Sequence, residues 1–484
     1  MNAAPLTPLR DFSDRLSPML VKELRHGLRT RIFTSVLTTF QVCMILIVGT
    51  GILGVEAKVI GNVFWSVALL ALFVALPLRG FGILSGEVQG GTMDMLTLTS
   101  MSAFRIVWGK WSALFSQTLL LACSLLPYLV ARYQFGGVEI VRELIALTVA
   151  VLGSALATAA FVAFSSQRSL VIRLLLTIGI FIALLPITSF TFVMINDTGG
   201  DAVMRSLMSL SGLEQTGIIA GIFCLVAYSI FTFLSLGASR IASVSENHSS
   251  WKRVIHLGMM TLLTLIGFAL SFHPAKEAFF WVFVPAMYLT LLIGLDVTTE
   301  EMPRYPSVMW KGQYRQMLGR LIYPGWASGV MFYILLGVMC LSTLMVYWSQ
   351  HPGNSFDEFV IVMACFLLSM VLPVCLRPNK TNRFVNWWVV QIALLLIGIL
   401  LMMFMGMSGN HDLGSLGVLT PITGMLGATD NYRHGDEIMM TTMVFGCCWL
   451  LAAMVLAAHE SKLYAQLERE AEKLTPSLPQ TFEP

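Results

Sequence analysis

Residues 32–55 read I-F-T-S-V-L-T-T-F-Q-V-C-M-I-L-I-V-G-T-G-I-L-G-V and contain no Asp, Glu, Lys or Arg. A bilayer core about 30 Å thick needs roughly 20 apolar residues of helix, so this run is long enough to cross it. The run is also longer than the roughly 7–15-residue apolar core of a signal peptide, and no A-x-A cleavage site follows it. We therefore expect it to remain in the mature protein as the first transmembrane helix.

Apolar runs of this kind recur along the whole chain. Of its 484 residues, 56% are hydrophobic and 12% are charged, whereas a soluble domain carries about 25% charged residues. The charges collect in short clusters between the apolar runs. This pattern predicts an all-α membrane protein with about twelve transmembrane helices. The expected spans are 32–55, 60–78, 111–131, 144–164, 174–195, 217–239, 254–272, 278–295, 326–348, 358–376, 386–407 and 439–458.

The basic residues between these spans predict the orientation of the chain. If the N-terminus is cytoplasmic, the cytoplasmic segments hold 24 of the 30 Lys and Arg residues. Those segments are 1–31, 79–110, 165–173, 240–253, 296–325, 377–385 and 459–484. The other side then holds Lys58, Arg132, Arg142, Arg205, Lys276 and Arg433. Because Lys and Arg concentrate in cytoplasmic loops, we expect both termini in the cytoplasm.

Reporter fusions test this topology directly. Fusions at residues 90, 310 and 470 are expected to report the cytoplasm, and fusions at 200 and 420 the outer side. An outer-side signal from the 310 fusion would contradict the twelve-span arrangement.

The two halves of the expected topology match in layout. A long cytoplasmic connection follows the second and eighth spans, and a long outer loop, 196–216 or 408–438, precedes the last span of each half. This layout predicts two tandem six-helix halves in the same orientation. The expected segments are an N-terminal segment 1–31, halves 32–239 and 240–458, and a C-terminal helix and tail 459–484. Loop 408–438 contains Pro421, Gly424 and Gly427 and fits a re-entrant gate or a plain surface loop equally well.

The interiors of the expected spans contain no Asp, Glu, Lys or Arg. Ion-coupled carriers normally need ionisable groups within the bilayer, so the pattern favours a transporter energised from outside the membrane. The eight cysteines lie in apolar runs without C-x-x-C spacing, and we expect no metal or redox centre. The net charge of +3 gives no reason to expect a nucleic-acid partner.

The N-terminal segment predicts an amphipathic helix. Ser17 can cap it, and Pro18 suits its first turn. Apolar residues recur every four positions while cations occupy the other faces, which is typical of a helix in the cytoplasmic headgroup layer. The alternative is a basic flank that only sets topology. The residues of the expected interfacial helix are Pro18, Leu20, Leu24, Arg25, Leu28 and Arg29. Residues 250–253 form a shorter version before the seventh span.

The cytoplasmic connection after the second span contains G86-E-V-Q-G-G-T-M-D-M-L-T-L-T-S-M-S-A-F-R-I-V-W-G-K110. Gly90 and Gly91 break a helix, and Thr92 can cap a new one with Asp94 at its positive end. Ser102 can cap the helix that leads into the third span. The sequence therefore predicts a short amphipathic helix between two caps, parallel to the membrane.

These residues resemble the permease subunits of ABC-2-type ABC transporters. That family shows an acidic residue, Gly-Thr, a leucine-rich turn and Gly-Lys between the second and third spans. The matching residues here are Glu87, Gly91, Thr92, Leu96, Ser102, Gly109 and Lys110. Ser100 stands where the family often has Pro. The resemblance covers residues 17–130, and its layout extends to about 240. In the second half, loop 298–306 keeps acidic residues but lacks Gly-Thr.

The resemblance implies a permease subunit of an exporter in a bacterial inner membrane. A separate ABC ATP-binding subunit would dock on the coupling segment 79–110 and drive transport. The chain has no G-x-x-x-x-G-K-[ST] motif, so we expect no ATP hydrolysis and no cofactor in this chain, with ATP bound by the partner. The expected partners are that subunit and the lipid bilayer, and the pathway could form from a homodimer or from a pseudo-dimer within one chain.

Two other functions fit the sequence less well. A twelve-helix secondary transporter explains the repeat, and dependence of transport on an ion gradient would identify it. A polytopic membrane transferase would need a catalytic cluster near the bilayer. The polar candidates for that cluster are the outer-loop residues His411, Asp412, Asp430, Arg433, His434, Asp436 and Glu437. No span has a polar lining that indicates the transported substrate.

Overall fold

The computed structural model describes ten stretches of the chain, and they are helical, with no strand among them. The described residues are 18–85, 102–134, 139–167, 170–195, 197–242, 247–272, 276–305, 319–350, 383–408 and 435–473. The chain divides into two compact units, Met1–Ile241 and Ala242–Pro484. They are called the first and second unit below, and each is described by itself.

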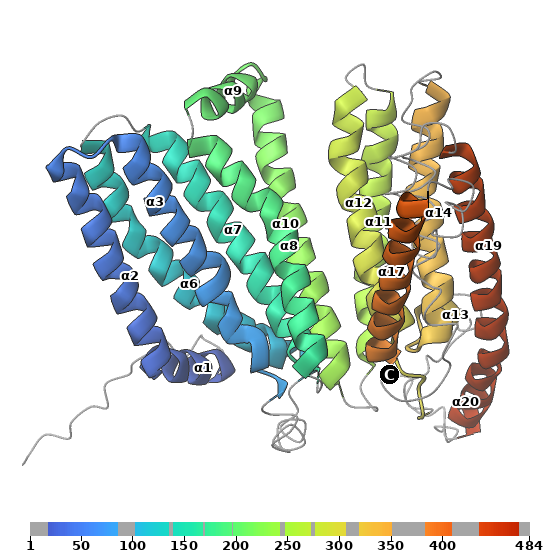
Figure 1. Ribbon diagram of the computed structural model, residues 1–484. Helices are drawn as coiled ribbons and strands as arrows, with labels where there is room; N and C mark the ends of the chain where they lie inside the picture. Colours follow the sequence, from blue (N-terminus) through green and yellow to red (C-terminus); the bar gives the residue numbers. More distant parts are fainter. Residues whose placement is uncertain are drawn as a thin grey trace, which may run out of the picture. The chain divides into compact units, whose positions relative to one another are not determined.

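The first unit is a bundle of long helices with a short helix at each end (Figure 1). Its elements are α1 (Pro18–Arg29), α2 (Arg31–Gly49) with η1 (Thr50–Leu53), α3 (Ala57–Leu70) with η2 (Ala71–Ala75) and η3 (Pro77–Gly82), α6 (Ala103–Gln134), α7 (Ile140–Phe164), α8 (Leu170–Ile195), α9 (Asp197–Met208) and α10 (Gly212–Ile241). The short helix α1 lies at one end of the bundle and α9 at the other.

The second unit is also a helical bundle. Its elements are α11 (His248–Ser271), α12 (Lys276–Thr298), α13 (Gly319–Ile322), α14 (Trp326–Gln350), α17 (Arg383–Ser408), α19 (Gly435–Glu460) and α20 (Lys462–Lys473). Helices α11, α12 and α14 pack against one another, and α19 packs on α14. Aromatic residues fill part of this core: the rings of Phe279 and Tyr347 stack with centroids 4.2 Å apart.

Eight helices among the described residues are long and apolar enough to cross a membrane. Their outward faces carry large exposed apolar side chains such as Leu46, Leu185 and Leu265. An apolar surface of this extent is stable only where lipid covers it. Together these features indicate a helical multi-pass membrane protein. Helices α12 and α17 contain shorter apolar stretches, 282–298 and 389–398.

A helix occupies each of the eleven expected spans that fall within the described residues. The tenth expected span, 358–376, lies outside them. The figure of twelve spans, the tandem duplication and the cytoplasmic termini therefore stay predictions.

Several helices extend beyond the charge-free spans expected from the sequence. Helix α6 begins at Ala103 rather than near 111 and so contains Lys110, and α7 begins at Ile140 and contains Glu143. Both side chains are buried and paired with an opposite charge. A helix can continue past its apolar run when the flanking charges are neutralised inside the protein. The expected spans 111–131 and 144–164 themselves hold no charged residue, but the helices that contain them begin earlier and include Lys110 and Glu143.

The second membrane helix changes its winding at one point. Helix α3 passes into the π-helix η2 and then into the 3₁₀-helix η3, which begins at Pro77. A π-turn disturbs the regular backbone hydrogen bonds, and Ser154 of α7 donates its hydroxyl to the carbonyl of Leu72 at 2.6 Å. After this change of winding the described chain continues to Ser85. The expected connection 79–110 is therefore shorter, because Arg79 belongs to η3 and residues 103–110 belong to α6.

Candidate functional site

The site that the sequence singles out begins and ends at the α1 end of the first unit. After η3 the chain is described as far as Ser85, and it is described again from Ser102. Between them, the 86–101 segment carries Glu87, Gly91, Thr92 and Leu96, which lie outside the described residues. What the structure describes is how the two ends of this segment are held.

Helix α1 is amphipathic, as the sequence predicts. Leu20, Leu24 and Leu28 are half-buried, and Arg25 and Arg29 are exposed. The helix begins at Pro18 and packs on α6. Gly27 faces the side chain of Gln117 on α6, since a Cβ atom at Gly27 would lie 2.2 Å from Nε2 of Gln117. Part of the apolar stripe is therefore covered by the protein itself.

Arg79 fixes the elbow between α1 and α2. Its guanidinium donates to the side-chain oxygen of Gln117 on α6, to Oγ1 of Thr30 at 3.0 Å and to the carbonyl of Gly27 at 3.3 Å. It also lies over the ring of Phe33, 5.4 Å from the centroid. Sequence reasoning treated Arg79 only as a cation that sets topology. The one sequence signal for this role was the position of Arg79 directly after the apolar run 60–78.

Lys110 ties α6 to α1 by an ion pair. Its Nζ lies 3.2 Å from Oε1 of Glu23, and the two side chains are 3% and 13% exposed. Gly109, beside it, is also buried in α6. The Gly-Lys pair of the family resemblance thus lies within a helix and beneath α1. Ser102 caps this helix as expected, since its Oγ accepts a hydrogen bond from the backbone N–H of Arg105 at 3.4 Å.

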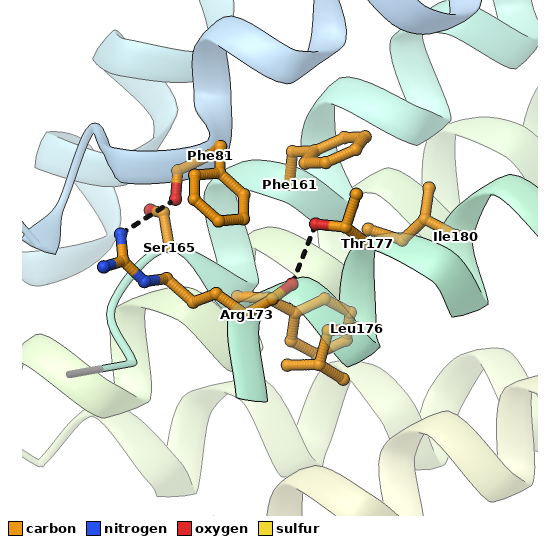
Figure 2. Close-up of a pocket in the computed structure, with 8 residues that line it drawn as sticks. Phe81, Phe161, Ser165, Arg173, Leu176, Thr177 and Ile180 are labelled. Carbon is orange, nitrogen blue, oxygen red and sulfur yellow. Dashed lines mark hydrogen bonds between the residues drawn. The ribbon is translucent and has the colours of Figure 1, made fainter. Parts of the chain in front are cut away.

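The other end of the 86–101 segment is held by the turn between α7 and α8. Ser165 accepts a hydrogen bond from the backbone N–H of Leu84 at 3.3 Å. Arg173 donates to Oγ of Ser85 at 3.0 Å and to the carbonyl of Phe81 at 3.4 Å. A small pocket beside these contacts is shown in Figure 2. The 86–101 segment is therefore attached to α6 at its end and to η3, α7 and α8 at its start.

The second unit contains a buried cluster of four charges, called the Glu300 cluster: Lys252, Arg253, Asp296 and Glu300. Nζ of Lys252 lies 2.7 Å from Oδ2 of Asp296 and 2.5 Å from Glu300. Arg253 also contacts Glu300. The prediction that residues 250–253 form a short interfacial helix was wrong, because they belong to α11 and Lys252 and Arg253 are buried. His256 is fully buried one turn further along α11.

Glu300 accepts hydrogen bonds from neutral groups as well. Ser249 donates its hydroxyl at 2.7 Å, and the backbone N–H of Gly325 donates at 3.1 Å. Burial alone would raise the pKa of Glu300, but the attraction of Arg253 and Lys252, with hydrogen bonds from Lys252 and Ser249, lowers that pKa to about 2. The Glu300 carboxylate is therefore buried and fixed by these partners, and it does not belong to a solvent-exposed loop.

The C-terminal helix α20 closes over this cluster. The hydroxyl of Tyr464 donates to the carbonyl of Pro324 at 3.0 Å and lies 3.2 Å from Oγ of Ser328. Gly325 adopts φ +119°, and a Cβ there would lie 2.6 Å from the Tyr464 hydroxyl, so the turn requires glycine. A helix is present in 459–484 as expected, and one face of it is buried in the second unit; its cytoplasmic location stays a prediction.

A third polar cluster joins α3, α6 and α7. Arg132 lies 3.0 Å from Oε2 of Glu143, and the indole N–H of Trp65 donates to the same oxygen at 2.7 Å. The guanidinium also lies over the ring of Phe64 at 4.7 Å. Sequence reasoning assigned Arg132 to an outer loop and did not foresee its burial, because its acidic partner comes from the next helix.

These clusters pair opposite charges and join helices, so they serve as rigid attachments. Within the described stretches, no group of His, Cys, Asp and Glu could hold a metal ion. The candidates for a transferase site at 411, 412, 430, 433 and 434 lie outside the described residues, and positions 436 and 437 fall in the first turn of α19.

Comparison of the chain with protein-family models, curated proteins and solved structures found no match. The fold itself defines the class, a helical multi-pass membrane protein.

Proposed function

We propose that this chain is the transmembrane permease subunit of an ABC-2-type ABC exporter, driven by a separate ATP-binding subunit. The sequence of the 86–101 segment and its flanks supports the family. The observation that carries the proposal is the double attachment of this segment: Ser85 is bonded to Arg173 of α8, and α6, which begins at Ala103, holds α1 through Lys110. Eight apolar helices supply the membrane part.

The mechanism follows from these attachments. The ATP-binding subunit binds the 86–101 segment. When that subunit moves on binding and hydrolysing ATP, it displaces both ends of the segment. At one end α6 moves together with α1, because the Glu23–Lys110 pair joins them. The hydrogen bonds of Arg79, which reach from η3 to Thr30 and to Gln117 of α6, must break or shift in this movement. At the other end η3 moves with the turn between α7 and α8. Moving these two groups of helices relative to each other opens the pathway on alternate sides.

Charge reversal at Glu87 tests the coupling assignment. Glu87→Arg replaces an anion by a cation at the proposed contact with the ATP-binding subunit. Like charges across an interface cost several kcal/mol. Gly91→Val disturbs the turn that begins the docking helix. Both variants should insert in the membrane at normal levels and lose co-purification with the ATP-binding subunit, or its stimulation.

The matched control is Glu301→Arg in the second unit. Glu301 is 61% exposed and only loosely paired with Arg304, at 3.8 Å. The neighbouring Glu300 is unsuitable as a surface control because it is buried in the Glu300 cluster. If Glu87→Arg and Gly91→Val keep both transport and partner binding, the coupling assignment fails.

A secondary transporter is the second candidate, and the Arg132–Glu143 pair is the observation that favours it. Carriers use ionisable groups buried among their membrane helices, and these two side chains are buried in α6 and α7. Uptake or export by reconstituted vesicles, driven by an ion gradient without ATP, would identify this function. The permease proposal requires ATP and the partner subunit.

A further inference from the structure

Each unit has one long connection between its second and third expected spans. In the first unit this connection leads from η3 to α6 and contains the 86–101 segment. In the second unit it leads from α12 to α14, and the structure describes its start, 299–305, and its end, 319–325. They are called the first and second connection below, and their ends are held in different ways.

The start and the end of the second connection are bonded to each other. Arg253 of α11 contacts Glu300 at the start. At the end, Arg253 donates to the carbonyls of Leu321 at 3.1 Å and of Gly325 at 3.0 Å. Glu300 in turn accepts a hydrogen bond from the backbone N–H of Gly325 at 3.1 Å. Both charged side chains are buried, and separating a buried ion pair leaves a charge inside the protein without its partner.

Packing and a further helix strengthen this closure. A Cβ atom at Gly325 would lie 2.9 Å from Sδ of Met302, so the end of the connection packs directly on its start. Helix α20 covers the same place: the hydroxyl of Tyr464 donates to the carbonyl of Pro324 and lies 3.6 Å from Sδ of Met302. Helices α13 and α20 lie at the same end of the second unit (Figure 1). The second connection therefore begins and ends on one rigid base.

The first connection has its ends on different helices. Ser85, at its start, is bonded to Arg173 of α8, and its end continues directly into α6 at Ala103. A hydrogen bond from Arg79 to the neutral side chain of Gln117 joins η3 to α6. Such a bond can be exchanged for another at much smaller cost than a buried ion pair. The two ends of the first connection can therefore move relative to each other.

We propose that the second connection is a fixed part of the fold and that the first connection alone transmits movement from an ATP-binding subunit. Moving the ends of the second connection apart would separate Arg253 from Glu300 and both from the Gly325 backbone. The ATP-binding subunit thus drives each chain through one connection, at the 86–101 segment. This last step rests on the proposed function, whereas the closure of the second connection does not.

Hydrogen exchange of the purified full chain tests the closure without any ATP-binding subunit. Mass spectrometry with fragmentation resolves single amides. The backbone N–H groups of Gly325 and Leu84 form a matched pair, because each donates to a side chain at the edge of its connection. Amides held in buried, charge-paired structure open only with large unfolding events, so we expect Gly325 to exchange about a hundredfold or more slowly than Leu84.

A variant and a control sharpen this measurement. Arg253→Lys keeps the charge but cannot bind Glu300 and two carbonyls at once, so exchange at Gly325 should rise about tenfold or more. Arg304→Gln, at an arginine of the same connection that is 67% exposed, should leave this exchange unchanged. Equal exchange of Gly325 and Leu84 in the wild type, or wild-type exchange at Gly325 in Arg253→Lys, would overturn the closure.

Linker replacement in the complex with the ATP-binding subunit tests the functional step. Replacing residues 307–317 by a Gly-Ser linker of equal length should preserve both co-purification and ATP hydrolysis by the complex, because the ends of the second connection are held without that stretch. The same replacement of residues 88–98 should abolish both. Loss of ATP hydrolysis by the 307–317 variant, with Gly325 still protected from exchange, would overturn the proposal. An 88–98 variant that keeps co-purification and hydrolysis would refute the proposed function and leave the closure of the second connection standing.

Discussion

Glu300→Ala is expected to destabilise the second unit by about 3–5 kcal/mol, the usual cost of removing one partner from a buried ion pair. The alanine would leave Lys252 and Arg253 inside the protein with only Asp296 to balance them. It would also remove the acceptor of Ser249 and of the Gly325 backbone. SDS-driven unfolding in mixed micelles, followed by tryptophan fluorescence, measures this change.

The control for this prediction is Glu301→Ala, one residue further along. Because its side chain is exposed, we expect a change within about 0.5 kcal/mol. A Glu300→Ala protein that unfolds at the same SDS fraction as the Glu301→Ala protein would show that the cluster does not hold the second unit together.

Acid should weaken the same cluster in a defined range. The pKa of Glu300 falls from an ordinary value of 4.5 to about 2 in the folded protein, so the stabilisation is complete above about pH 4.5. It declines as the pH falls below 4.5, and it is lost as the pH passes the folded pKa. The stability difference between the wild type and Glu300→Gln should therefore narrow between pH 5 and pH 2.

Helix positions were predictable from the sequence because the length of an apolar run alone determines whether a helix can cross a bilayer. The run 326–348 and the helix Trp326–Gln350 agree to within two residues. Helix starts next to charges were predicted less well. A lysine at the edge of an apolar run normally marks the membrane surface, so Lys110, directly before the run 111–131, was placed outside the third span, although it is buried within α6.

The buried clusters were not predictable because their partners are distant in the sequence. Glu23 and Lys110 are 87 positions apart, and Lys252 and Asp296 are 44 positions apart. A helical pattern relates only residues three or four positions apart. Ser102 is the contrasting case: its cap depends on Arg105, three residues later, and the sequence predicted it. A local rule thus predicted the cap at Ser102 but not the contacts that fix the two ends of the 86–101 segment.

The second large effect is expected at the Glu23–Lys110 pair. Glu23→Lys would place two cations side by side between α1 and α6, where Lys110 is almost fully buried. Losing one partner of such a pair costs about 2–5 kcal/mol, and because Glu23 is partly exposed we expect about 3 kcal/mol. A change of this size raises the fraction of molecules in which α1 is detached from α6 roughly a hundredfold.

Limited trypsin digestion measures that population, because cleavage after Lys22, Arg25 or Arg29 requires the helix to open. Glu23→Lys should be cut in this region roughly a hundredfold faster than the wild type, and Lys110→Glu should behave similarly. The charge swap, Glu23→Lys with Lys110→Glu, should restore protection, since the pair is remade with reversed polarity. His26→Gln, on the exposed face of the same helix, should be cut at the wild-type rate. Wild-type rates in both single variants would mean that α1 is held by the Arg79 contacts and its apolar stripe, and that Lys110 does not carry movement from α6 to α1.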